Sequence, residues 1–209
     1  MKIGYIDDKG SDLRIFQRRA SEDFDEVVGI ELKDNILEII QEIIECRVDA
    51  IVVDYLLNEG NSNIHFNGAD VVKKLEEEKI EFPSFILTSF DQDAENELID
   101  VNKIYNKERY YDVENEGYKI LNRRIRRQIE NYRNLIKQAE EKILKLKNKG
   151  ELAAKEKEAL IELDEFLVKA TSTSSKLPKE LKTNTVEEKL DNIIEMANYL
   201  LEEVKKNND

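Results

Sequence analysis

The sequence predicts an α/β fold in which a doubly wound, five-stranded parallel sheet over residues 1–110 precedes an all-α helical hairpin or bundle over residues 111–209. Two observations support this prediction. In the first half, short apolar runs alternate with amphipathic segments, as strands alternate with helices in βα units. In the second half, apolar residues recur at spacings of four and three, which is typical of helices that pack along one another.

The first βα unit is expected to contain a buried strand at 2–6 and a helix at 11–24, with Ser11 or Asp12 as the N-cap. A second strand is expected at 26–32, where valine, isoleucine and leucine cluster. These runs are continuously apolar rather than alternating. They therefore indicate a parallel sheet that is covered on both faces.

The second and third units repeat this pattern. A helix is predicted at 34–47, capped by Asp34, because five isoleucines fall on one of its faces. They are Ile36, Ile39, Ile40, Ile43 and Ile44. A strand at 50–53 and a helix at 68–79 follow, and the run from 50 to 53 is wholly apolar, as expected for a central strand.

The last elements of the first half are shorter. Pro83 precedes a strand predicted at 84–88, and a helix at 91–99 leads to a fifth strand at 103–106. Five such strands with helices between them, within about 110 residues, fit a doubly wound sheet of flavodoxin-like strand order.

The second half is predicted to be a helical, coiled-coil-like extension. Apolar side chains form a seam along one long helix from about 113 to 148. The seam consists of Ile125, Ile129, Tyr132, Ile136, Ala139, Ile143 and Leu146. A turn at 148–151, where Gly150 suits the position after a helix end, leads to a second helix at 151–169.

A third helix is predicted to begin at Thr185, which forms a capping box with Glu188, and to continue to about residue 204. A loop at 171–184 would separate it from the hairpin. Packing of this helix against the hairpin and pairing of two copies into a homodimeric bundle both remain open.

Polar side chains stand at the carboxyl ends of the predicted strands. They are Asp7, Asp8, Asp54, Thr88, Ser89 and Lys107. Because the carboxyl ends of parallel strands meet at one edge of the sheet, we expect these side chains to lie close together. Carboxylate oxygens suit Mg²⁺, while a lysine and a hydroxyl suit phosphoryl oxygens.

This set of residues, in this order and on these strand ends, resembles the receiver domain of two-component response regulators over about residues 1–110. The resemblance implies that Asp54 accepts a phosphoryl group from the phosphohistidine of a histidine kinase or a phosphotransfer protein. On this basis Asp54 is the residue that carries the chemistry, and the chain is not expected to be an enzyme that turns over a substrate.

The resemblance also implies a Mg²⁺ cofactor. The implied ligands are Asp7, Asp8, Asp54 and the backbone carbonyl of Leu56. Thr88 and Lys107 would contact the transferred phosphoryl group, whereas Ser89 is expected to be a small neighbour that leaves access to the site.

Three features depart from the pattern of the family. The segment from 54 to 68 is longer than usual and contains an insertion around 58–67. Glu108 follows Lys107, where the family usually has proline before a cis peptide bond. The aromatic switch residue normally lies three positions before the lysine, where this chain has Ile104, with Tyr105 next to it.

Charge and composition exclude several functions. The net charge is −13, and residues 1–110 hold all of the excess, with 13 Lys or Arg against 26 Asp or Glu. Such a surface argues against nucleic-acid binding, and the basic segment at 123–128 is followed by acids on the same helix. With a single cysteine, Cys46, and no long apolar run, the expected location is the cytoplasm, with no membrane partner.

Three functions are compatible with these residues. The first is a phosphorylated receiver whose helical extension binds a downstream protein. The second is a receiver-like binding or scaffold module that is not phosphorylated. The third, a Mg²⁺-dependent phosphohydrolase, is disfavoured because Leu56 stands where such enzymes place an acid–base catalyst. The only histidine, His65, lies in the predicted loop, so the helices cannot relay a phosphoryl group through histidine.

Overall fold

A five-stranded, all-parallel sheet with the strand order β2-β1-β3-β4-β5 forms the centre of the protein. The computed structural model describes residues 1–58, 63–89, 100–114, 116–149 and 151–171. The strands are β1 (Lys2–Ile6), β2 (Glu26–Gly29), β3 (Ala50–Asp54), β4 (Ser84–Thr88) and β5 (Ile104–Asn106). The predicted fold class, a doubly wound flavodoxin-like sheet followed by a helical region, is confirmed.

Helices connect the strands and continue after the sheet. They are α1 (Gly10–Ala20), α2 (Ile36–Glu45), α3 (Gly68–Glu78), η1 (Val101–Lys103), α5 (Lys107–Tyr111), α6 (Gly117–Lys147) and α7 (Ala154–Thr171). Four predicted features lie wholly or almost wholly outside the described residues. They are the helix at 91–99, the turn residue Gly150, the loop at 171–184 and the helix from Thr185. Residues Met1–Thr173 form one compact unit.

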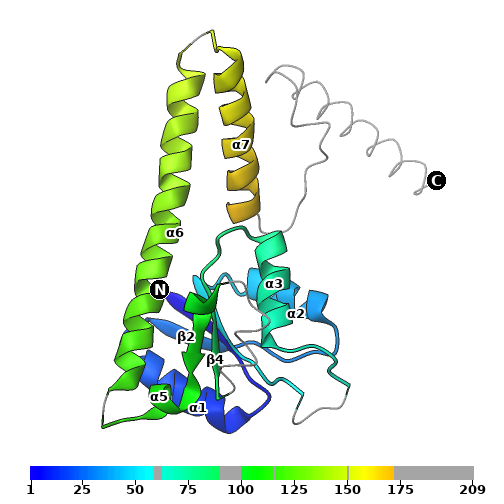
Figure 1. Ribbon diagram of the computed structural model, residues 1–209, viewed down its shortest axis with the longest axis vertical. Helices are drawn as coiled ribbons and strands as arrows, with labels where there is room; N and C mark the ends of the chain where they lie inside the picture. Colours follow the sequence, from blue (N-terminus) through cyan, green and yellow to red (C-terminus); the bar gives the residue numbers. More distant parts are fainter. Residues whose placement is uncertain (59–62, 90–99, 115, 150, 172–209) are drawn as a thin grey trace, which may run out of the picture. The chain divides into compact units, whose positions relative to one another are not determined.

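Helices cover both faces of the sheet. Successive side chains of a strand point to opposite faces, so each strand packs against both helical layers. Val52 lies in a core cluster with α1 and α6, whereas its neighbours Ile51 and Val53 lie in a second cluster with α2 and α3. Figure 1 shows α6 on one side of the sheet and α2 and α3 on the other. Each buried side chain of this size contributes about 1.5–3 kcal/mol, so the continuous apolar run of β3 stabilises both layers.

Two predicted helix caps were wrong. Helix α1 begins at Gly10 and makes no side-chain cap bond, so neither Ser11 nor Asp12 is its N-cap. The carboxylate of Asp7 instead accepts a hydrogen bond of 2.8 Å from the backbone N–H of Lys9, which starts the helix earlier. Helix α2 is capped by Asn35 rather than by Asp34, because the Asn35 side chain accepts from the backbone N–H of Leu37.

The long helix predicted from about 113 begins later, at Gly117, and the short helix α5 precedes it. A Cβ at Gly117 would clash with the backbone carbonyl of Arg109, so glycine permits close contact between α5 and α6. The hydroxyl of Tyr110 on α5 donates to Asn122 on α6 at 3.4 Å, and both residues are buried. The two helices are therefore joined by packing as well as by the chain.

Helices α6 and α7 form the predicted hairpin and run side by side (Figure 1). The predicted seam of α6 packs in two parts: Ile125 and Ile129 contact the sheet layer, and Ala139 and Ile143 are buried beyond it. Between these parts, the Tyr132 hydroxyl donates a 2.8 Å hydrogen bond to the carbonyl of Ala170 near the end of α7. Within the described ranges, no helix is both long enough and apolar enough to cross a membrane.

Candidate functional site

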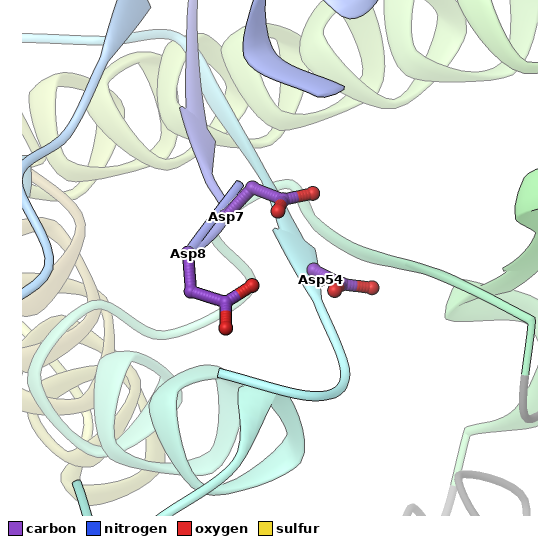
Figure 2. Close-up of side chains that lie close together, drawn as sticks. All are labelled: Asp7, Asp8 and Asp54. Atoms are coloured by element: carbon purple, nitrogen blue, oxygen red, sulfur yellow. The ribbon is translucent and has the colours of Figure 1, made fainter. Parts of the chain in front are cut away.

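The site lies at the carboxyl ends of β1 and β3, where the strand order reverses. The register pairs Ile6 with Val53, so the residues that follow, Asp7 and Asp54, come next to each other at the sheet edge. Figure 2 shows Asp7, Asp8 and Asp54 converging there from the ends of the two strands. The structure thus brings together the three carboxylates that the sequence placed at this edge.

Lys107 is the cation at the centre of the site. As the first residue of α5 it follows β5 directly, and its side chain is 9% exposed. Its ammonium lies 2.8 Å from Asp7 Oδ2 and 3.2 Å from Asp54 Oδ2. A third carboxylate, Asp12 Oδ2 in the first turn of α1, lies 2.7 Å away. Because an ammonium has three N–H donors, these acids can use its full donor capacity.

Asp7 is held in place from several sides. Its carboxylate accepts hydrogen bonds from the Tyr5 hydroxyl at 2.7 Å, from the Lys9 backbone N–H and from Lys107. The Tyr5 ring is itself fixed by stacking on Phe16 at a centroid distance of 4.2 Å. The position of Asp7 therefore depends on β1, α1 and α5 together.

Asp54 is the last residue of β3 and is 5% exposed. Burial raises its pKa to about 7 because it disfavours the charged carboxylate. The ammonium of Lys107 opposes this shift, whereas the negative charge of Asp7 adds to it. Near neutral pH, the protonated and the ionised forms of Asp54 are therefore both populated.

The pKa of Lys107 is raised. Burial alone would lower it, but hydrogen bonds to Asp12 and Asp7 and the charge of Asp54 outweigh the effect of burial. Lys107 thus stays charged throughout the physiological range and offsets part of the negative charge of the acids around it.

The three acids at the strand ends fit a small divalent cation. One oxygen each from Asp7, Asp8 and Asp54 lies within 4.8 Å of the other two. Ligand oxygens around an octahedral Mg²⁺ lie about 3–4 Å apart, so small side-chain movements would bring them into range. The donors are oxygens only, which matches the preference of Mg²⁺ rather than that of zinc.

A pocket of about 190 Å³ opens next to these acids. Its lining includes Asp54, Lys107, Asp12, Leu56, Ser89 and Tyr111. Leu56 and Ser89 are thus at the site, as the sequence suggested. Thr88 is fully buried at the end of β4, directly before Ser89. The roles assigned to Thr88 and to the carbonyl of Leu56 stay predictions.

Gly68, the first residue of α3, packs against the backbone of Asp54 and Tyr55. Its N–H donates a 2.9 Å hydrogen bond to the carbonyl of Tyr55, and a Cβ at Gly68 would clash with the carbonyl oxygen of Asp54. Asn67 caps α3 through a capping box with Asp70, which sets where the helix begins. The start of α3 therefore determines the path of the chain directly after Asp54.

The predicted departures from the family pattern have structural counterparts. The peptide bond between Lys107 and Glu108 is trans. Ile104 packs against the cluster with α2 and α3, whereas Tyr105 faces α6. The guanidinium of Arg124 lies 5.2 Å from the centre of the Tyr105 ring and donates a 3.1 Å hydrogen bond to its hydroxyl.

Sequence reasoning missed Asp12, which it assigned to a helix cap. It also did not foresee that the Tyr5 hydroxyl donates to Asp7 or that Tyr111 lines the pocket. One signal for Asp12 was available: it is the acid in the first turn of the helix that begins at the carboxyl end of β1. His65 is exposed, and Cys46 is half-buried and free.

No protein-family model matches this chain, and no curated protein is significantly similar to it.

Proposed function

We propose that this chain is a receiver of the two-component type that accepts a phosphoryl group on Asp54. The observation that carries the proposal is the placement of a buried carboxyl at a strand end, 3.2 Å from a buried lysine and beside two further acids. An acid that only ended a strand would need none of these neighbours.

The chemistry would be an in-line transfer from a phosphohistidine of a histidine kinase or a phosphotransfer protein. A carboxylate oxygen of Asp54 would form a new bond to phosphorus while the nitrogen–phosphorus bond of the donor breaks. The imidazole nitrogen would keep the electron pair and take a proton from water. The residues of the chain contribute position and charge balance rather than proton transfer.

Each group has a separate task in this proposal. Asp54 must be ionised to attack, which its pKa of about 7 allows near neutral pH. Asp7, Asp8 and Asp54 would hold Mg²⁺, which supplies positive charge that balances the phosphoryl oxygens. Lys107 would donate to one of these oxygens.

The output would pass to a downstream protein through the helices. Lys107 begins α5, and α5 packs against the start of α6 through Tyr110 and Gly117. A movement of Lys107 on phosphorylation would therefore reach α6 through a short, tightly packed connection.

The test is a phosphorylation assay with acetyl phosphate and Mg²⁺, read by intact mass. The wild type should gain one phosphoryl group that is lost on mild base treatment, and Asp54→Asn should gain none. Glu108→Gln is a suitable control because Glu108 lies at the pocket without an ion pair to Lys107 among those described. A wild type that stays unmodified, or an adduct that persists in Asp54→Asn, would contradict the proposal.

The alternative is a receiver-like module that binds its partner without phosphorylation. The specific observation in its favour is that Lys107 already contacts three carboxylates, so a phosphoryl oxygen would have to displace one of them. This alternative predicts that the protein binds no beryllofluoride in the presence of Mg²⁺ and still binds its partner through α6 and α7.

A further inference from the structure

The third carboxylate on Lys107 is the feature that the proposed function leaves unexplained. Asp12 Oδ2 lies 2.7 Å from the Lys107 ammonium, the shortest of the three contacts. Asp12 belongs to α1 rather than to a strand end, and its side chain is 18% exposed. It is also not one of the three acids whose oxygens come together at the candidate cation site.

The three partners of Lys107 would respond differently to a phosphoryl group. Asp54 becomes the acyl phosphate itself, and Asp7 is one of the acids that would turn toward Mg²⁺. Asp12 has neither task, so its carboxylate would remain beside the ammonium. A phosphoryl oxygen that approaches Lys107 must then share the ammonium with this carboxylate, and the two negative groups repel each other.

We infer that Asp12 is a positioning residue that competes with the phosphoryl group for Lys107 and so weakens the hold of the site on the phosphorylated state. This inference rests on the proposed function. Asp12 keeps Lys107 paired before transfer and limits how strongly Lys107 pairs afterwards. The same contact that balances charge in the resting site therefore works against the modified one.

The size of the effect follows from the repulsion that the Asp12 carboxylate would exert on a phosphoryl oxygen at the same ammonium. A factor of ten in affinity corresponds to about 1.4 kcal/mol. Removing the charge of Asp12 should therefore tighten the binding of a phosphoryl analogue by about tenfold or more.

The experiment measures the binding of beryllofluoride in the presence of MgCl₂ to the full chain. The chain has no tryptophan and eight tyrosines, and Tyr111 lines the pocket, so tyrosine fluorescence is a suitable signal. Asp12→Asn should bind about tenfold more tightly than the wild type. Asp12→Glu keeps the carboxylate and should stay within about threefold of the wild type.

The control for charge alone is Glu108→Gln, which removes one negative charge from the same pocket. It should change the affinity by less than about threefold. Circular dichroism checks that each variant is folded, and Asp12→Ser serves as a second variant if Asp12→Asn is not. The direction of the effect is diagnostic, because loss of a merely structural residue would weaken binding.

Different results overturn different statements. If the wild type binds and Asp12→Asn binds equally or more weakly, the inference about Asp12 is wrong and the proposed function stands. Equal gains in Asp12→Asn and Glu108→Gln, or a gain in Asp12→Glu as large as in Asp12→Asn, also overturn the inference. If neither the wild type nor the Asp12 variants bind, the proposed function fails and the inference fails with it.

Discussion

Replacing Asp54 with asparagine should stabilise the protein, and the gain should grow with pH. The pKa of Asp54 is about 7 in the folded protein, against an ordinary value of 3.8. Between these two values the folded state holds a proton that the unfolded chain has released. The stability of the wild type therefore falls as the pH rises from about 4 to 7, whereas asparagine has no proton to lose.

The magnitude follows from the same two pKa values. One pKa unit corresponds to about 1.4 kcal/mol, so complete ionisation of buried Asp54 costs about 4 kcal/mol. At pH 5 about 2 kcal/mol of this cost is present, and at pH 8 nearly all of it. The advantage of Asp54→Asn over the wild type should thus increase by roughly 2–3 kcal/mol between pH 5 and pH 8. Asp7 and Asp12 also contact Lys107, so we expect its ammonium to stay paired in the variant.

Urea unfolding of both proteins at pH 5 and pH 8, in EDTA, measures this difference. Carboxyl groups far from Asp54 titrate alike in both proteins, so their contributions cancel in the comparison. An advantage of Asp54→Asn that is the same at both pH values would refute the assignment of a raised pKa. A variant less stable than the wild type at pH 8 would show that the contact with Lys107 outweighs the cost of burial.

Two further predictions concern the cation site and the backbone beneath it. Added Mg²⁺ should raise the melting temperature of the wild type more at pH 8 than at pH 6, because protons compete with the cation for Asp54. It should have little effect on the melting temperature of Asp54→Asn. Equal effects on both proteins would contradict binding at this site. Gly68→Ala should lower the free energy of unfolding by about 1–3 kcal/mol because its Cβ would clash with the carbonyl of Asp54. The matched control is Gly10→Ala, because a Cβ at Gly10 would meet only Arg14 at 3.8 Å. This variant should be as stable as the wild type or more stable. Similar losses of stability in both variants would refute this account.

The sheet and its functional edge could be predicted from the sequence. Strands such as 50–53 are continuous apolar runs, and a run of this kind between amphipathic segments has few alternatives to a buried parallel strand. Once the strands are parallel, their carboxyl ends must lie at one edge, so the proximity of Asp7, Asp8 and Asp54 follows from topology alone.

The partners of the polar side chains could not be predicted in the same way. Asp12 is a plausible N-cap by residue type, and only the three-dimensional position of Lys107 draws it into the site. The capping choice between Asp34 and Asn35 depends on where the chain turns after β2, which no local pattern specifies. The seam of α6 likewise predicted a helix, but not that the sheet would cover Ile125 and Ile129.

The close contact between Gly117 and Arg109 restricts insertions and deletions near the start of α6 more than at the far end of the α6–α7 hairpin. An insertion or deletion within α6 between Gly117 and Ile125 would rotate these two residues relative to each other by about 100° for each residue. Gly117 and Ile125 could then no longer both keep their contacts. The far end of the hairpin carries no such restriction, since α6 and α7 could both be lengthened or shortened there by whole heptads. Natural variation in size should therefore be found at the tip of the hairpin and be rare at its root.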